Sequence, residues 1–169
     1  MKVSIHSLAV EQVSHTLNQV LLFLDKAVAY AEAKKFDVSV LLNARIAPDM
    51  FPLTKQIQIA CDNAKFGVAR LSGTEAPKFE DNEKTVEELR ARIRKTIDFV
   101  KSVPASAFEG GEDRDIKIVV PNRTFEMKGL TYLRGWVIPN VMFHVVTAYL
   151  ILRHNGVDVG KRDFLGDIA

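Results

Sequence analysis

Two polar side chains interrupt the apolar segment VIPNVMFHVVTAYLILRHNG, which covers residues 137–156. Asn140 and His144 stand at positions i and i+4, which share one face of an α-helix. An imidazole beside a carboxamide on one face could ligate a metal ion, bind a small polar ligand, or complete a buried hydrogen bond. These residues alone leave all three possibilities open, so the partners brought by other helices become important.

A second predicted helix could bring Gln56 and Asp49 to the same place. The segment APDMFPLTKQ predicts a helix start with Asp49 as the N-cap and Pro52 inside the first turn, where its missing N–H costs nothing. Sites in helical bundles are built from side chains that project inward from facing helices. If the two helices are neighbours, we expect His144, Asn140 and Gln56 to converge on a small polar pocket, with Asp49 able to add a carboxylate.

One imidazole and two neutral carboxamides form a weak set of metal ligands. Zinc and related ions prefer imidazole, thiolate and carboxylate groups, and a catalytic zinc ion normally has three protein ligands. The N-cap role predicted for Asp49 would commit its oxygen to backbone N–H groups. The residues therefore favour a hydrogen-bonded histidine or a metal-free ligand pocket over a metal ion at His144.

Cys61 is the only cysteine, which excludes an internal disulfide and indicates a reducing compartment. It follows an apolar stripe and has no CxxC partner, so a small buried hydrophobe is the favoured interpretation. A nucleophilic thiol would need a base nearby, and proximity to His144 is left open by the sequence.

Four segments carry apolar side chains at the three- and four-residue spacing of amphipathic helices, at residues 7–34, 49–73, 85–104 and 139–156. Thr85 with Glu88 forms a capping box, and Gly73 and Gly156 are typical helix stops. Two short runs, Ile116–Val120 and Thr124–Lys128, flank turn residues and predict a β-hairpin. We therefore predict an all-α protein, a four-helix bundle with a small hairpin inserted between helices 3 and 4.

Length and composition predict one globular domain over residues 1–169. The chain is 47% hydrophobic and 26% charged, with a net charge of +2. That charge gives no reason to expect nucleic acid, and we interpret RARIRK, residues 90–95, as a solvated helix face. No apolar run approaches the roughly 18–20 residues of a membrane span, and the first residues do not form a signal peptide. A cytoplasmic protein without a membrane partner is expected.

The stretch NVMFHVVTAYLILRHNG resembles the last bundle helix of the DinB/YfiT-like metalloenzyme superfamily, which has two histidines four residues apart and a leucine-rich run ending in arginine and glycine. Here Asn140 and His144 occupy those two positions, and Arg153 and Gly156 end the run. The resemblance is closer to one branch of the superfamily, bacterial domains of unknown function, through ARIAPDMFPLTKQIQIACDNAK and FHVVTAYLILRHNGVDVGK.

The resemblance implies a metal triad of one histidine on helix 2 and two on helix 4, commonly holding nickel or zinc. Only His144 matches, since Asn140 replaces one ligand and Gln56 is the nearest residue on helix 2. We therefore expect a degenerate metal site in a non-catalytic or small-ligand-binding module. The alternative is a metal-dependent thiol transferase or small-molecule hydrolase with altered ligands around His144. Members of the superfamily often pair through bundle faces, so the resemblance implies a homodimer. Trp136 and Phe143 are the first candidate contact residues, and burial inside the bundle is the equal alternative for both.

Overall fold

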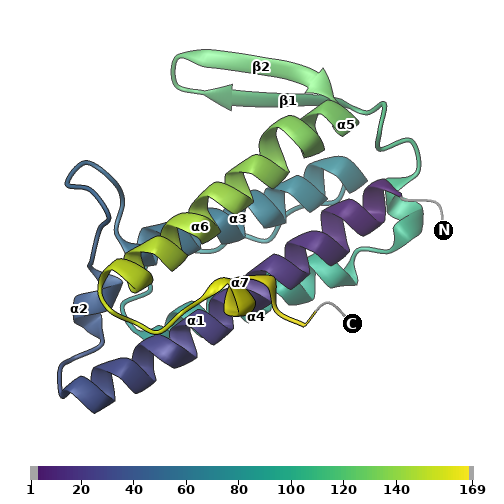
Figure 1. Ribbon diagram of the computed structural model, residues 1–169. Coiled ribbons are helices and arrows are strands. Elements are labelled where there is room, and N and C mark those ends of the chain that lie inside the picture. The colour runs from purple at the N-terminus through teal and green to yellow at the C-terminus, as the bar shows by residue number, and fades with distance from the viewer. Residues whose placement is uncertain (1–3, 168–169) are drawn as a thin grey trace.

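The computed structural model describes residues 4–167 and consists mainly of long helices packed side by side (Figure 1). The long helices are α1 (Val13–Lys34), α3 (Leu53–Ser72), α4 (Val86–Ser102) and α6 (Ile138–His154). Helix α3 packs against both α6 and α4, and α1 also packs against α6 and α4. The helices that carry Gln56 and His144, α3 and α6, are therefore neighbours.

Shorter elements connect and extend the long helices, so the predicted count of four helices is not confirmed. They are η1 (Ser7–Gln12), α2 (Ser39–Leu42), η2 (Ala105–Phe108), α5 (Gly129–Tyr132), η3 (Leu133–Val137) and α7 (Lys161–Leu165). Each long helix contributes aliphatic side chains to one continuous core, for example Leu24 of α1, Ile57 of α3, Ile93 of α4 and Ile151 of α6. The core lies between the helices that carry the candidate site.

The start of α3 differs from the predicted one. The helix begins at Leu53, after Pro52 with an extended backbone, and no side chain caps it. Asp49 is exposed in a turn instead. A proline ring disfavours helical geometry in the residue before it, so Phe51 cannot join the helix and Asp49 lies too early to be the N-cap. By contrast, the capping box of Thr85 and Glu88 is present at the start of α4.

The last helix also begins earlier than predicted. Helical backbone runs without interruption from Gly129 to His154, through α5, η3 and α6. Pro139 was expected to start this helix. It lies just after the wider π-helical turn of η3, a kind of irregularity that can accommodate a residue without a backbone N–H. Gly156 ends the helix at φ 90°, as predicted.

By length and composition alone, the helix Gly129–His154 is long and apolar enough to cross a membrane. It is also a core helix of the bundle, with Val141, Val145 and Ile151 buried between its neighbours. Core helices of globular proteins commonly combine such length and apolarity. The feature is therefore weak evidence for a membrane span.

The predicted hairpin is confirmed. Strands β1 (Asp115–Val120) and β2 (Arg123–Lys128) pair antiparallel, and they lie beside α5 at the start of the last helix (Figure 1). The ring of Phe125 on β2 meets Trp136 edge-to-face at 5.0 Å between centroids. This contact attaches the hairpin to the bundle and leaves Trp136 half-buried.

Candidate functional site

His144 and Gln56 meet across the interface between α6 and α3. Nδ1 of His144 lies 2.7 Å from Oε1 of Gln56. The amide nitrogen of Gln56 donates to the carbonyl oxygen of Phe51 at 3.0 Å, so its oxygen must face the imidazole. An amide oxygen only accepts hydrogen bonds, and Nδ1 of His144 therefore carries the ring proton. This tautomer leaves the lone pair of Nε2 available.

Burial keeps this imidazole neutral. Desolvation lowers the pKa of His144 from its ordinary value of 6.5, because the surrounding protein disfavours the charged ring. Gln56 itself is only 2% exposed. A neutral histidine whose Nδ1–H is held by a side-chain carbonyl presents Nε2 as a hydrogen-bond acceptor or a single metal ligand.

The other two predicted pocket residues do not join this pair. Asn140 donates from Nδ2 to the carbonyl oxygen of Trp136 at 2.7 Å, one turn back along its own helix. Asp49 is exposed and forms no hydrogen bond or ion pair within residues 4–167. Over the same residues, no group of three histidine, cysteine, aspartate or glutamate side chains could hold a metal ion. The donor set therefore does not fit the three-ligand metal site implied by the superfamily.

The protonation of His144 gives a first test. We expect its ring to titrate with a midpoint below 6.5 and to carry its neutral-state proton on Nδ1, both readable by ¹⁵N-detected NMR. The unfolded chain then binds more protons than the folded chain just below pH 6.5, so stability falls as the pH drops through this window and levels off below the folded-state pKa. His144→Gln should remove this part of the pH dependence. A proton on Nε2 in the neutral ring would contradict the geometry.

An exposed apolar stripe runs along α6 next to the site. Phe143, Val146 and Leu150 are 56%, 37% and 44% exposed. The Phe143 ring meets the imidazole of His144 edge-on, with centroids 5.2 Å apart. The imidazole of His144 is thus bordered by an aromatic ring.

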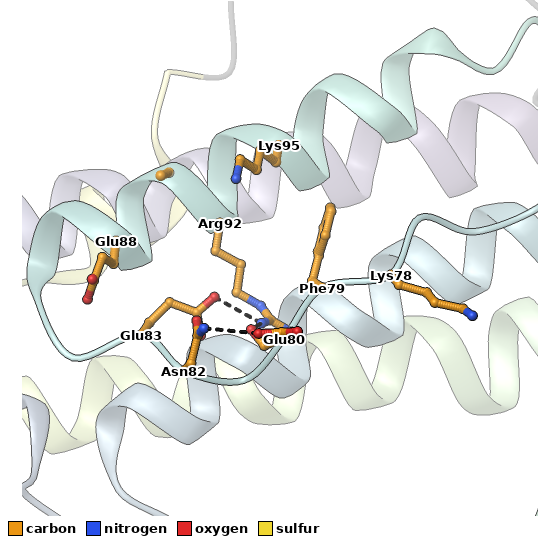
Figure 2. Close-up of a pocket in the computed structure, with 9 residues that line it drawn as sticks. Lys78, Phe79, Glu80, Asn82, Glu83, Glu88, Arg92 and Lys95 are labelled. Atoms are coloured by element: carbon orange, nitrogen blue, oxygen red, sulfur yellow. Dashed lines mark hydrogen bonds and ion pairs between the residues drawn. The ribbon is translucent and has the colours of Figure 1, made fainter.

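A second polar cluster, which the sequence analysis missed, lies on the opposite side of α3. Arg92 of α4 is only 2% exposed, so the interpretation of RARIRK as a solvated face is wrong at this residue. Its guanidinium contacts Glu83 at 3.0 Å, Asp62 at 3.0 Å and Asp81 at 2.9 Å. These ion pairs fasten the connection between α3 and α4 to both helices. Figure 2 shows Arg92 of α4 reaching toward Glu83 of this connection.

Lys65 and Cys61 complete this side of α3. The Lys65 ammonium is buried 3.0 Å from Asp62 and lies over the ring of Phe79, 4.4 Å from its centroid. Cys61 is fully buried near Thr96, and burial raises the pKa of its thiol to about 12. The charged groups acting on Cys61 are Arg92 and its carboxylate partners. Cys61 therefore faces α4, and its surroundings favour the buried, inert role over a thiolate nucleophile.

One sequence signal could have identified Arg92. Leu89, Ile93 and Ile97 form the apolar stripe of α4, and Arg92, three residues after Leu89, borders that stripe. A charged residue on a core-facing arc must find partners of opposite charge. The acidic residues of the preceding connection are the nearest such partners in the sequence.

A helical bundle with an antiparallel hairpin before its last helix is a DinB-like fold. Residues 5–165 match the family described as "Domain of unknown function (DUF1993)", and the chain belongs to this family. A crystal structure of a DinB family member protein from Shewanella denitrificans is 44% identical, covers 97% of this chain and 93% of its own, and superposes with a TM-score of 0.90. Comparison with curated proteins gives no match. The predicted DinB-like fold is confirmed.

Proposed function

We propose that this chain is a small-ligand-binding member of the DinB-like bundles with a degenerate metal site. The single observation that carries the proposal is the hydrogen bond between His144 and Gln56. Gln56 stands nearest to the position of the superfamily's helix-2 histidine, and here its amide orients the His144 ring. The hydrogen bond favours the neutral ring and leaves the lone pair of Nε2 available. A site of this kind binds a ligand through one directed hydrogen bond and surrounding apolar contact.

The chemistry of Nε2 defines the class of ligand. A neutral imidazole nitrogen accepts a hydrogen bond, so the ligand must supply a donor such as a hydroxyl, an amide N–H or an ammonium group. The ring of Phe143 beside His144 favours a ligand with an apolar part next to that donor, bound at the edge of the apolar stripe on α6. Small amphipathic alcohols and amides combine both features.

This class can be tested by ¹⁵N NMR on the His144 ring. We would titrate benzyl alcohol and benzamide against their methylated counterparts, benzyl methyl ether and N,N-dimethylbenzamide. The donor compounds should shift Nε2 selectively, whereas the methylated compounds should not, because they cannot donate a hydrogen bond. Equal shifts from both sets would show that only ring-current or apolar contact is being measured, and would contradict the proposal.

A metal-dependent enzyme is the second candidate. The observation that favours it is the fixed tautomer, because metal-binding histidines commonly donate their other ring N–H to a carbonyl or carboxylate. A thiol transferase or a small-molecule hydrolase would need two or more further ligands. Asn140 and Asp49 supply none in the observed geometry. Metal content separates the two candidates.

Restoring the superfamily ligands gives a gain-of-function test. Position 56 lies within hydrogen-bond reach of His144, and position 140 is one helical turn away on the same helix. We expect the double variant Gln56→His/Asn140→His to bind zinc and nickel at least about 100-fold more tightly than the native chain, because three imidazoles complete a metal site. Competition with a chromogenic chelator measures the affinity.

Gln58→His/Asn140→His is the matched control. Gln58 lies on the same helix but hydrogen-bonds Glu83, on the side of α3 that faces α4. This variant also adds two histidines, but only the one at position 140 lies near His144, so it offers two imidazoles at the site instead of three. Equal metal affinity in both double variants would mean that positions 56, 140 and 144 do not converge as three metal ligands.

We also propose that the partner is a second copy of this chain, paired through the apolar stripe on α6. No charged residue lies between Arg134 and Arg153, so two copies can join along this face without burying a charge. Phe143→Glu should convert a dimer to a monomer in sedimentation velocity, since it places a carboxylate at the contact. Leu22→Glu on α1, also at an exposed leucine, should leave the dimer intact. A monomeric native chain would refute this part of the proposal.

A further inference from the structure

The connection between α3 and α4 is attached to the helices through side chains. Within residues 4–167, no backbone–backbone hydrogen bond involves residues 74–84 of this connection. The other long connection, residues 35–52, contains turns closed by such bonds, for example from the N–H of Val40 to the carbonyl oxygen of Asp37 at 3.0 Å. Residues 74–84 can therefore move away from the helices without breaking a backbone ladder, which is typical of segments that open locally.

Arg92 of α4 is the centre of these attachments. One terminal nitrogen of its guanidinium donates to the carbonyl oxygen of Glu80 at 3.1 Å and to the carboxylate of Glu83 at 3.0 Å, as Figure 2 shows. The other terminal nitrogen lies 2.9 Å from Asp81. Gln58 of α3 adds one hydrogen bond to Glu83 at 2.8 Å. Because most of these contacts share one side chain, they can be lost together.

The closed arrangement is imperfect in three respects. Nε of Arg92 is buried and has no acceptor within residues 4–167, which costs free energy that water would recover if the connection moved away. Asp81 and Lys55 pair at 35% exposure each, and such exposed ion pairs contribute little. A cavity of about 250 Å³ separates part of the connection from α4 (Figure 2). These features lower the cost of opening.

The connection covers a polar seam between α3 and α4. Cys61, Asp62 and Lys65 share one face of α3, and Arg92 and Thr96 of α4 lie opposite them. All but Asp62 are at most 2% exposed. A helix interface that stays dry is normally apolar, because buried charges cost free energy even when they are paired. The seam therefore fits a face that meets water when the connection moves.

We propose that residues 74–84 form a lid that opens while the long helices stay packed, and that the lid controls the access of water and small polar solutes to this seam. In the open form Glu83 leaves Arg92, and the ring of Phe79 leaves the Lys65 ammonium, which it covers at 4.4 Å in the closed form. Cys61 becomes reachable, because Glu83 and Arg92 are among the charged groups that act on it. The lid uses no contact of His144, so each proposal can fail without the other.

The thiol of Cys61 reports on the lid. We would measure the rate at which iodoacetamide alkylates Cys61 in the full chain at increasing urea concentrations below the unfolding transition. Opening of the lid exposes little surface, so the free energy of the opening that exposes Cys61 should depend on urea at most about one-third as steeply as global unfolding does. It should also be smaller than the free energy of global unfolding.

The double variant Cys61→Ala/Ala27→Cys is the control for this measurement. It moves the thiol to the middle of α1, where position 27 is 0% exposed and lies away from the lid. Labelling at position 27 should follow global unfolding in full. The same urea dependence for both cysteines would overturn the proposal.

A variant in the lid itself tests which segment moves. Phe79→Ala should speed the labelling of Cys61 about tenfold in the absence of urea, because the closed lid loses its ring contacts with Lys65 and Arg92. Phe51→Ala, at an exposed phenylalanine in the connection before α3, should leave the rate unchanged. Far-UV circular dichroism checks that both variants keep their helices. Equal labelling rates in the two folded variants would contradict the lid.

Discussion

Replacing Arg92 with alanine is expected to lower the free energy of unfolding by about 3–5 kcal/mol, measured by urea denaturation, because the change leaves carboxylates without their partner inside the protein. The side chain of Glu83 is 9% exposed and that of Asp62 is 28% exposed. The loss of the partner charge therefore costs most at the more buried Glu83. Loss of the same contacts also releases the connection between α3 and α4. Both effects act in the same direction.

Arg94→Ala is the matched control for this prediction. Arg94 is an exposed arginine on the same helix, and its replacement should change stability by less than about 0.5 kcal/mol. The rate at which the Cys61 thiol reacts with a thiol reagent is a second measurement. Cys61 is buried near Arg92, so we expect this rate to rise in Arg92→Ala. Equal stability of the two variants would mean that Arg92 does not hold the two helices together.

Gly129→Ala is expected to destabilise the protein by about 3 kcal/mol. A methyl group at Gly129 would overlap the backbone carbonyl oxygen of Gly111, which cannot move aside as a flexible side chain could. Gly129 begins the last helix directly after β2, and the N–H of Leu130 donates to Glu112 at 2.9 Å. The added methyl group therefore separates the hairpin and the start of the last helix from the segment before β1.

Gly135→Ala in the same helix is the control. Within residues 4–167, and apart from the backbone of its own helix and its two chain neighbours, no atom lies within 4 Å of a methyl group at Gly135, so the change should be neutral or stabilising by up to about 1 kcal/mol through helix propensity. Denaturation curves of the two variants at equal conditions decide the matter. A destabilised Gly135→Ala beside a native-like Gly129→Ala would contradict the close approach of Gly129 to Gly111.

Local rules in the sequence were sufficient for much of the fold. The capping box at Thr85, the helix stop at Gly73 and the hairpin around residues 121–122 depend on neighbouring residues, and all are present in the structure. Asp49 failed as an N-cap because Pro52 excludes Phe51 from the helix. The early start of the last helix at Gly129 depends on a π-helical turn that the apolar periodicity does not reveal.

The candidate site was predictable only in part. Helical spacing and the resemblance to the superfamily indicated that Gln56 and His144 would converge if their helices were neighbours. In the structure the two side chains are in contact. The role of Gln56 could not be predicted, because it depends on the carbonyl of Phe51 fixing the amide orientation. The ion pairs of Arg92 were missed because they join three segments whose arrangement is set by tertiary packing.

We propose that the superfamily metal position is reduced here to one neutral histidine held by Gln56. The most direct test is elemental analysis of the tag-free protein beside its His144→Ala variant, followed by titration with zinc and nickel while the thermal midpoint is read, since a metal ion that binds only the folded chain must raise it. We predict substoichiometric metal in both proteins and no difference between their thermal responses. Near-stoichiometric nickel or zinc that disappears with His144 would contradict the claim and favour the metal-dependent enzyme.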